Sequence, residues 1–360
     1  MPAPFPQAKD GSVLKNSPTG FPGFFTKRQP RVVTADVWAF LRQAAVSALP
    51  RQDEKAALAF IEQAFEFFEA ARNPRMGSRP LLYYYSFLNL AKAFLLIRKV
   101  TLAVAIQHGI SDPKENVTRR LEFSGQKVRF VKCAHDHSHL FPEFVKGLGT
   151  EIHKPRELKV ISMLRQIPGI HRTFCKVTGE NPSFLPVKHF VLISHGGKIF
   201  SRMAVSKSDS DTKATLPVIR GRRAFRKAFS QVLCPKSDEL WFESKEVAGI
   251  KRGIDTAIRK IATMVGNLGV WSILTAQGYR YYLCSIPPRE MLPPLASIYA
   301  VMFYLGSITR YKPYDFDRIV SGRFSWLVGE FLSTQPTQFL YGLAGHVAGV
   351  DVVRPFATVD

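Results

Sequence analysis

The chain of 360 residues is poor in cysteine, and its four cysteines stand far apart. They are Cys133, Cys175, Cys234 and Cys284. Without a CxxC pair they indicate neither a disulfide framework nor a zinc ribbon. P-loop and GxGxxG turns are absent too, and Leu192 stands where a GxSxG nucleophile elbow around Ser194 requires its first glycine. No catalytic triad can therefore be assigned from the sequence, and we expect no cofactor.

Long apolar runs are also missing. Segments 81–97 and 295–308 are too short or too interrupted to cross a bilayer, which takes about 20 residues. The first 30 residues are rich in Pro, Gly and Lys and lack the apolar core of a secretory signal. We therefore expect a soluble, cytoplasmic protein with no membrane partner.

Acidic residues are scarce relative to basic ones, and the net charge is +22. Counting Lys and Arg against Asp and Glu gives +4 for 1–32, +2 for 33–112, +13 for 113–245 and +3 for 246–360. A concentrated basic excess attracts polyanions, so nucleic acid is the first partner to expect. A solubility surface, or a basic face that docks an acidic partner protein, is the alternative.

The pattern of apolar residues predicts an α+β fold that is mainly α. We expect an irregular arm at 1–32, a helical part at 33–112, a basic β-containing region at 113–245 and a helical part at 246–360. The two helical portions should pack together. The expected helices are Thr34 to Leu49, 52–72, Ser78 to about Gln107, 246–268, 295–311 and 316–331.

The segment Ser78 to Ile97 is apolar all round, yet Ser86, Asn89 and Lys92 recur at a spacing of three. Buried amides and ammonium groups need partners, so we expect Asn89 and Lys92 to be buried, with one of them hydrogen-bonded to the C-terminal half. The polar cluster predicted around them is Arg79, Asn89, Lys92, His108, Arg310 and Tyr311. It is either a functional site or a structural network that joins the two helical portions.

The most basic segment runs from 219 to 230. If it is helical, Phe225 and Phe229 face inward and the cations spread over the outside, where they can contact phosphates. The predicted nucleic-acid-binding residues are Arg220, Arg222, Arg223, Arg226 and Lys227. The alternative is an ordinary solvated face.

Cys133, His135, His137 and His139 alternate, and in a strand they would share one face. Four alternating ligands span too far to hold one ion, so we predict no tightly bound zinc. A weaker site at His135 and His137, completed by Asp136 or His153, and a plain polar loop are the alternatives.

Three pieces of sequence look familiar together: SRPLLYYYSFLNLAKAFLLI at 78–97, IQHGISDP at 106–113 and MFYLGSITRYKPYDFDRIVSGRFSWLVGEFL at 302–332. They resemble the YaaC-like family of bacterial proteins, which implies a fold but no activity. The Tyr-Tyr-Ser to Ala-Lys helix is also similar to HEPN-type helical domains. Many of these domains are ribonucleases of defence or toxin systems.

A HEPN ribonuclease uses an Arg and a His four to six residues apart on one helix. Arg129 with His135, and Arg165-Gln166 with His171, have that spacing. The first pair lies in a strand-like run, however, and Pro168-Gly169 interrupts the second. We expect an RNA-associated accessory or effector protein of bacterial stress or phage defence. A HEPN-like metal-independent ribonuclease and a structural subunit that docks an acidic partner are the alternatives.

Overall fold

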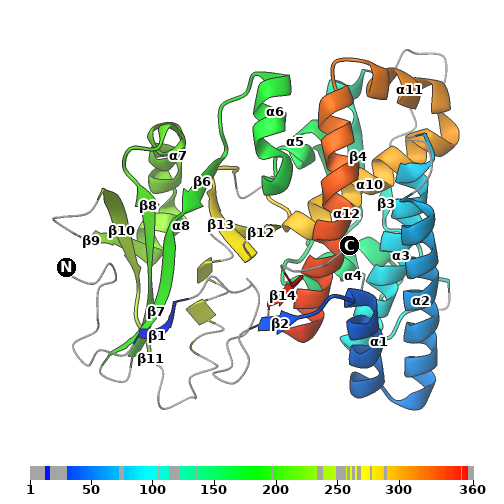
Figure 1. Ribbon diagram of the computed structural model, residues 1–360, viewed down its shortest axis with the longest axis horizontal. Coiled ribbons are helices and arrows are strands. Elements are labelled where there is room, and N and C mark those ends of the chain that lie inside the picture. Colours follow the sequence, from blue (N-terminus) through cyan, green and yellow to red (C-terminus); the bar gives the residue numbers. More distant parts are fainter. Residues whose placement is uncertain are drawn as a thin grey trace. The chain divides into compact units, whose positions relative to one another are not determined.

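The computed structural model describes residues 13–16, 31–72, 77–103, 105–112, 122–134, 136–195, 198–232, 238–248, 257, 260–261, 264–265, 269–275, 278–287, 290–349 and 351–355. Helices dominate and strands form several small sheets, so the predicted α+β, mainly α class is confirmed (Figure 1). The chain forms two compact units. Unit 1 comprises 1–33, 181–291 and 349–357, and unit 2 comprises 34–180, 292–348 and 358–360.

These units cut across the divisions drawn from charge and composition. Segment 113–180, predicted as part of the β-containing region, belongs to the helical unit 2, and segment 246–291 belongs to the strand-rich unit 1. Basic residues lie mainly on surfaces, so their density along the chain does not mark which segments share a core. The N- and C-terminal helical portions do pack together, because α3 and α10 are neighbours within unit 2.

Unit 2 is a helical assembly around one central helix. Its longer helices are α1 (Val37–Ala48), α2 (Arg51–Ala70), α3 (Arg79–Ile97), α10 (Pro294–Tyr311), α11 (Pro313–Ser321) and α12 (Ser325–Ala348). Shorter helices are α4 (Leu140–Gly147), α5 (Val160–Leu164), α6 (His171–Thr178) and the 3-10 turns Phe123–Gly125 and Pro168–Ile170. A small antiparallel sheet has the order β3 (Ile110–Ser111), β4 (Lys127–Phe130), β5 (Arg156–Lys159).

The first helix starts two residues later than expected. Asp36, not Thr34, caps it: the Asp36 carboxylate accepts hydrogen bonds from the backbone N–H groups of Trp38 and Ala39, each at 2.9 Å. A side-chain oxygen there satisfies N–H groups that have no partner within the helix. The Thr34 hydroxyl instead donates to the Asp36 carbonyl.

Helix α2 packs against α3 through a seam of small and large residues. Ala57, Ile61, Ala64 and Phe68 are buried at spacings of four, three and four. The two alanines allow the backbones to approach, and the Ser86 hydroxyl of α3 donates to the Ala64 carbonyl at 2.8 Å. Burial of this hydroxyl therefore leaves no unsatisfied donor.

The central helix α3 ends ten residues before the predicted stop at Gln107. Lys99 adopts a left-handed φ of 60°, Lys99 N–H bonds to the Leu96 carbonyl and Val100 N–H bonds to the Leu95 carbonyl. This is the hydrogen-bond pattern of a Schellman motif, in which glycine is the usual left-handed residue. A lysine stands there in this chain, which is why the sequence shows no stop signal at this point.

From Pro294 to Ala348 the structure has three helices, where the sequence predicts two. The predicted helix 316–331 is split, because α11 ends at Ser321 and α12 begins at Ser325. A side chain at Gly322 would lie 2.7 Å from the Arg318 carbonyl oxygen, so only glycine fits this close turn. Beyond the break α12 continues to Ala348 with Pro336 inside it.

Helix α3 is the one described helix that is long and apolar enough to cross a membrane. Most of it is buried inside unit 2, where it contacts α2, α10 and α12. A buried core helix of a globular domain has the same length and composition.

Unit 1 contains the larger sheet. The order is β1 (Val13–Asn16), β7 (His189–His195), β8 (Lys198–Ser206), β10 (Glu239–Ser244), β9 (Phe229–Val232), and β11 (Val247–Ala248) also pairs with β8. A second sheet has the order β12 (Val270–Thr275), β13 (Gly278–Cys284), β6 (Phe184–Val187). Strand β14 (Asp351–Val353) pairs in parallel with β2 (Arg31–Val33). Helices α7 (Ser210–Gly221) and α8 (Arg223–Ala228) complete the described elements.

Two strands arise where the sequence predicts an irregular arm, at Val13–Asn16 and Arg31–Val33, and the rest of 1–32 lies outside the described residues. The predicted helix 246–268 begins instead with strand β11. Further along, Ala257, Ile261 and Val265 are helical and buried in the core of unit 1. Residues 249–256 lie outside the described part of the chain.

Candidate nucleic-acid interface

The basic segment forms α7, an extended corner at Arg222 and the short helix α8. Phe225 of α8 is buried, stacks on Phe229 with ring centroids 5.5 Å apart and meets the edge of Phe242 at 5.4 Å. Both predicted inward aromatics are therefore buried, although Phe229 belongs to strand β9 rather than to the helix. This apolar contact fixes which side of α8 faces solvent.

Arg222 does not point outward as the phosphate ligand that the sequence predicts. Its side chain is partly buried, and its guanidinium donates to the Cys284 carbonyl at 2.8 Å and to the Ile286 carbonyl. Burial lowers the pKa of this guanidinium from its ordinary value. Arg222 thus holds the α7–α8 corner against the end of β13, and two of its five N–H donors are already used there.

The remaining cations of the segment are exposed. Arg220, Arg223, Arg226 and Lys227 all lie on the solvent side of α7 and α8. Lys245 is exposed beside them, because its backbone N–H bonds to the Ala228 carbonyl at the end of α8. We call these five residues the α8 basic face.

Carboxylates on the neighbouring strands have other partners. Glu243 pairs with Arg202 at 2.6 Å, and Glu246 pairs with Lys198 at 2.6 Å. Within the described part of the chain, none of the five cations of the α8 basic face forms an ion pair. Their charge is therefore available to an external anion.

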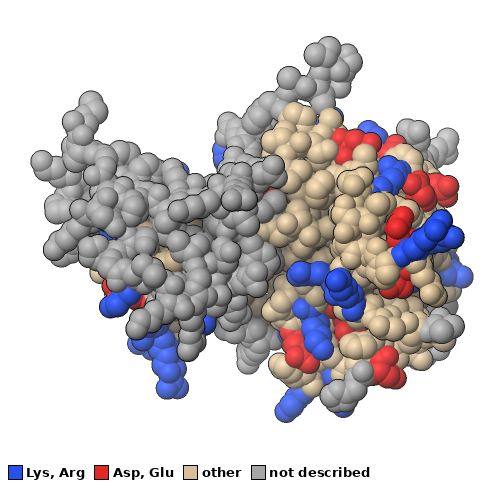
Figure 2. Space-filling model, turned by 90° about the horizontal axis from the view of Figure 1, so that it is seen from below, with Lys and Arg blue, Asp and Glu red and all other residues tan. Residues whose placement is uncertain are grey.

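Unit 1 as a whole is the more basic unit. Counting Lys and Arg against Asp and Glu gives +14 for unit 1 and +8 for the larger unit 2. On the face of unit 2 that Figure 2 shows, at the right, cations and carboxylates lie interspersed. Mixed charges of this kind cancel at a distance, whereas a local excess of one sign does not.

The predicted polar cluster does not converge on one point. Arg79 donates to the Arg72 carbonyl at the start of α3, and Arg310 donates to the Tyr85 hydroxyl at 3.2 Å on an exposed surface. Tyr311 is 67% exposed beneath the Arg310 guanidinium. These three residues lie outside the core.

Lys92 and His108 are brought near each other. The pKa of His108 is lowered by burial and by the charge of Lys92, and its Nδ1 lies 2.8 Å from the Tyr84 hydroxyl. Burial raises the pKa of Tyr84 well above its ordinary value, so this hydroxyl stays protonated. Asn89 is buried at 5% exposure as predicted, and Lys92 is half-buried. Among the described residues, neither side chain has a hydrogen bond to the C-terminal half, contrary to our expectation.

The histidine segment is a turn leading into α4, not a strand. His137 has φ of 53°, its N–H bonds to the Ala134 carbonyl, and His139 precedes the first residue of α4. His135 lies outside the described residues. Over the described residues no group of three potential metal ligands is assembled, and Cys133 donates to the Pro142 carbonyl. His153 stands by Glu151 instead.

A buried carboxylate in this segment escaped the sequence analysis. Glu143 is 2% exposed, and one of its oxygens lies 3.0 Å from Nδ1 of His137. The only hint in the sequence is that Glu143 stands between apolar neighbours in Leu-Phe-Pro-Glu-Phe-Val. Asp136 instead accepts a hydrogen bond from the Ser138 backbone at 3.1 Å.

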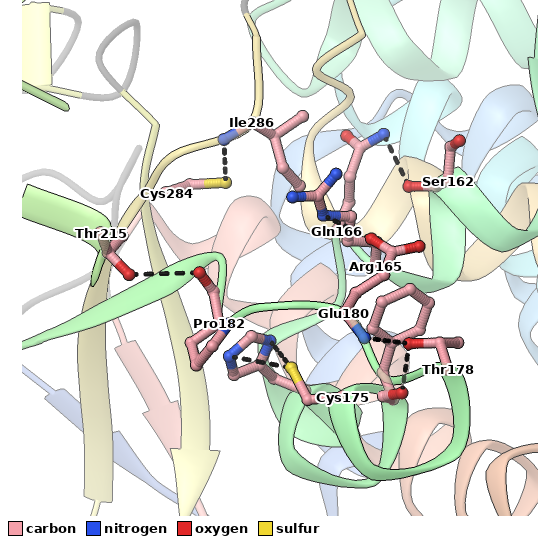
Figure 3. Close-up of polar contacts among 12 residues, drawn as sticks. Ser162, Arg165, Gln166, Cys175, Thr178, Glu180, Pro182, Thr215, Cys284 and Ile286 are labelled. Carbon is pink, nitrogen blue, oxygen red and sulfur yellow. Dashed lines mark hydrogen bonds and ion pairs between the residues drawn. The ribbon is translucent and has the colours of Figure 1, made fainter. Parts of the chain in front are cut away.

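The two Arg and His pairs have different surroundings. Arg129 in β4 is bound to Glu157 at 2.7 Å, and its partner His135 is not described. Arg165 pairs with Glu180 at 3.4 Å, while Gln166 donates to the Ser162 carbonyl (Figure 3). A 3-10 turn separates Arg165 from His171, so the two do not share a helix as HEPN ribonuclease pairs do.

His171 is buried at the start of α6, and the Cys175 sulfur lies 3.8 Å from its Nε2. Burial, with the charges of Arg172 and Arg165, lowers the pKa of His171 from 6.5 to about 4. The imidazole is thus neutral at pH 7. With so low a pKa it is also a weak proton acceptor, which is unfavourable for general base catalysis.

This lowered pKa predicts a loss of stability in acid. The unfolded chain takes up a proton at His171 below pH 6.5, whereas the folded chain does so only near pH 4. Stability from this group is therefore complete above pH 6.5 and falls as pH drops toward 4, by at most about 1.4 kcal/mol per pH unit. Urea unfolding between pH 7.5 and 4.5 should show a weaker pH dependence in His171→Gln than in the natural chain. A titration midpoint near pH 6.5 for the His171 imidazole, measured by NMR, would contradict this prediction.

Comparison with known protein families places most of the chain in one of them. A family described as YaaC-like Protein matches residues 24–347. No curated protein and no solved structure matches the chain.

Proposed function

Since the chain belongs to the YaaC-like family, whose description names no activity, we propose a function from its own residues: association with RNA through the α8 basic face. The observation that carries the proposal is the set of exposed cations that form no ion pair with any described residue, on a helix whose other side is anchored by Phe225. Cations that neutralise phosphates release condensed counterions, and this supplies affinity without a base-specific contact.

The structural role of Arg222 supports the same proposal. A short helix of six residues gains little stability from its own hydrogen bonds. The Arg222 contacts to two carbonyls and the buried Phe225 hold it in place before any ligand arrives. The exposed cations therefore stand on a fixed scaffold, which reduces the entropy cost of binding.

The RNA preference and a role as an accessory or effector protein in bacterial stress or phage defence are supported by the resemblance to HEPN-type domains alone. The phosphate chemistry of the α8 basic face is common to RNA and DNA. Binding assays should therefore compare a single-stranded RNA with a DNA duplex of equal phosphate number.

The test is a variant in which Arg220, Arg223, Arg226 and Lys227 are all changed to Gln. We expect it to bind a fluorescent single-stranded RNA roughly 100-fold more weakly at 0.15 M salt, because four phosphate contacts are lost. The measurement is fluorescence anisotropy, with thermal melting to show that the fold is retained.

A matched control removes the same charge elsewhere. Arg51, Lys55, Lys132 and Lys159 are exposed in unit 2, and changing all four to Gln should alter affinity by no more than a few fold. Equal losses in the two variants would show that only net charge matters and would remove the α8 basic face as the site. Retention of an acidic partner protein without RNA binding would favour the docking alternative.

A further inference from the structure

Unit 2 contains a pocket that the RNA proposal does not use. It has a volume of about 540 Å³ and lies among the end of α1, the start of α2, the last turns of α3 and residues 99–103 and 106. Phe60, Leu96, Val100, Leu102 and Ile106 supply most of its apolar wall. Pockets for small molecules have volumes of this order and are mostly apolar, with few polar groups.

Lys92 is the partly buried cation of this pocket, whereas its other polar lining residues, Asp53, Lys99 and Thr101, are exposed. The Lys92 ammonium lies over the Phe60 ring, 5.0 Å from the centroid, and burial alone lowers its pKa from the ordinary value. No carboxylate among the described residues pairs with it. Within the described residues this half-buried ammonium contacts an aromatic face and no hydrogen-bond acceptor, which favours an acceptor bound beside it.

The charges at the rim of the pocket do not offset the charge of Lys92. Asp53 and Lys99 line the pocket, are exposed and carry opposite charges. Exposed charges are screened by solvent and contribute little, whereas a partly buried charge is screened less. Lys92 therefore sets the sign of the potential inside the pocket, and the pocket favours an anion.

We propose that this pocket binds a small organic monocarboxylate with an apolar body, its carboxylate on the Lys92 ammonium and its chain or ring against the wall formed by Phe60 and Leu102. A single carboxylate matches the single interior cation, since a second anionic group would be buried without a partner. The apolar wall excludes small hydrophilic anions such as phosphate as preferred ligands. This site is independent of the α8 basic face, which belongs to unit 1.

The test is isothermal titration of the purified protein with octanoate, octan-1-ol and octylammonium. We expect saturable binding of octanoate, weaker binding of octan-1-ol and none of octylammonium. Lys92→Met should weaken octanoate binding at least about tenfold, because the charge-assisted contact is lost. Lys55 of α2 is exposed and does not line the pocket, so Lys55→Met is the matched control and should change the affinity less than about threefold.

A second variant tests the pocket without relying on Lys92→Met. If Lys92→Met does not melt cooperatively, Ala56→Trp replaces it, since a large side chain at this exposed lining position fills the pocket and should abolish binding. Absence of saturable octanoate binding, equal affinity for octanoate and octan-1-ol, or unchanged binding in both the Lys92→Met and Ala56→Trp variants would overturn the proposal.

Discussion

Phe339→Ala is expected to lower the free energy of unfolding by about 3–5 kcal/mol, the largest effect of any single substitution considered for this protein. Phe339 of α12 is fully buried and stacks on Phe87 of α3 with ring centroids 3.9 Å apart. Phe144 and Tyr299 also lie against it, at 5.8 Å and 6.3 Å. Removing the ring leaves a cavity at the point where three helices meet α3. Urea unfolding followed by circular dichroism measures the loss.

Trp326 on the same helix provides the control. Its side chain is 52% exposed, and its described ring contact is with the Lys176 ammonium at 5.8 Å. Trp326→Ala should therefore cost less than about 1 kcal/mol. If Phe339→Ala costs no more than Trp326→Ala, the α3–α12 contact does not form the core of unit 2.

Arg222→Met is expected to cost about 2 kcal/mol of stability, because the Cys284 and Ile286 carbonyls lose a charged donor. Its neighbour Arg223 is exposed and should behave in the opposite way. Arg223→Met should change stability by less than about 0.5 kcal/mol and weaken RNA binding roughly fourfold at 0.15 M salt. The measurements are thermal melting and fluorescence anisotropy on both variants.

Comparing the Arg222→Met and Arg223→Met variants distinguishes a residue that holds α8 in place from a residue that contacts RNA. An Arg222→Met variant that melts like the natural protein would show that its two carbonyl contacts do not hold α8. An Arg223→Met variant with unchanged RNA affinity would remove this residue from the α8 basic face.

The helical part of the fold could be predicted from the sequence because its signals are local. The apolar spacing in α2 and the apolar run of α3 predicted both helices, and the family resemblance is confirmed. The predicted end of α3 was ten residues too late, because Lys99 takes a conformation that usually requires glycine. Local backbone hydrogen bonds to the Leu95 and Leu96 carbonyls close that turn, and the periodicity of apolar residues does not report them.

The arrangement of unit 1 could not be predicted, because its strands pair over long distances in the sequence. Strand β1 pairs with β7, β6 pairs with β13 and β2 pairs with β14, so each pair joins segments far apart in the sequence. Short strands carry little pattern of their own. The role of Arg222 depends equally on carbonyls that lie more than 60 residues further along the chain. Composition predicted a basic segment there, but only the packing distinguishes Arg222 from Arg223.

The most direct test of the central claim is the salt dependence of RNA binding, measured for the natural protein and for the variant with Arg220, Arg223, Arg226 and Lys227 changed to Gln. Each phosphate contact to a single strand adds about 0.7 to the slope of log affinity against log salt concentration. The account predicts a steep slope for the natural protein that falls by roughly 3 in the variant. Equal slopes for the two proteins, or an affinity of the natural protein that does not change with salt, would contradict it.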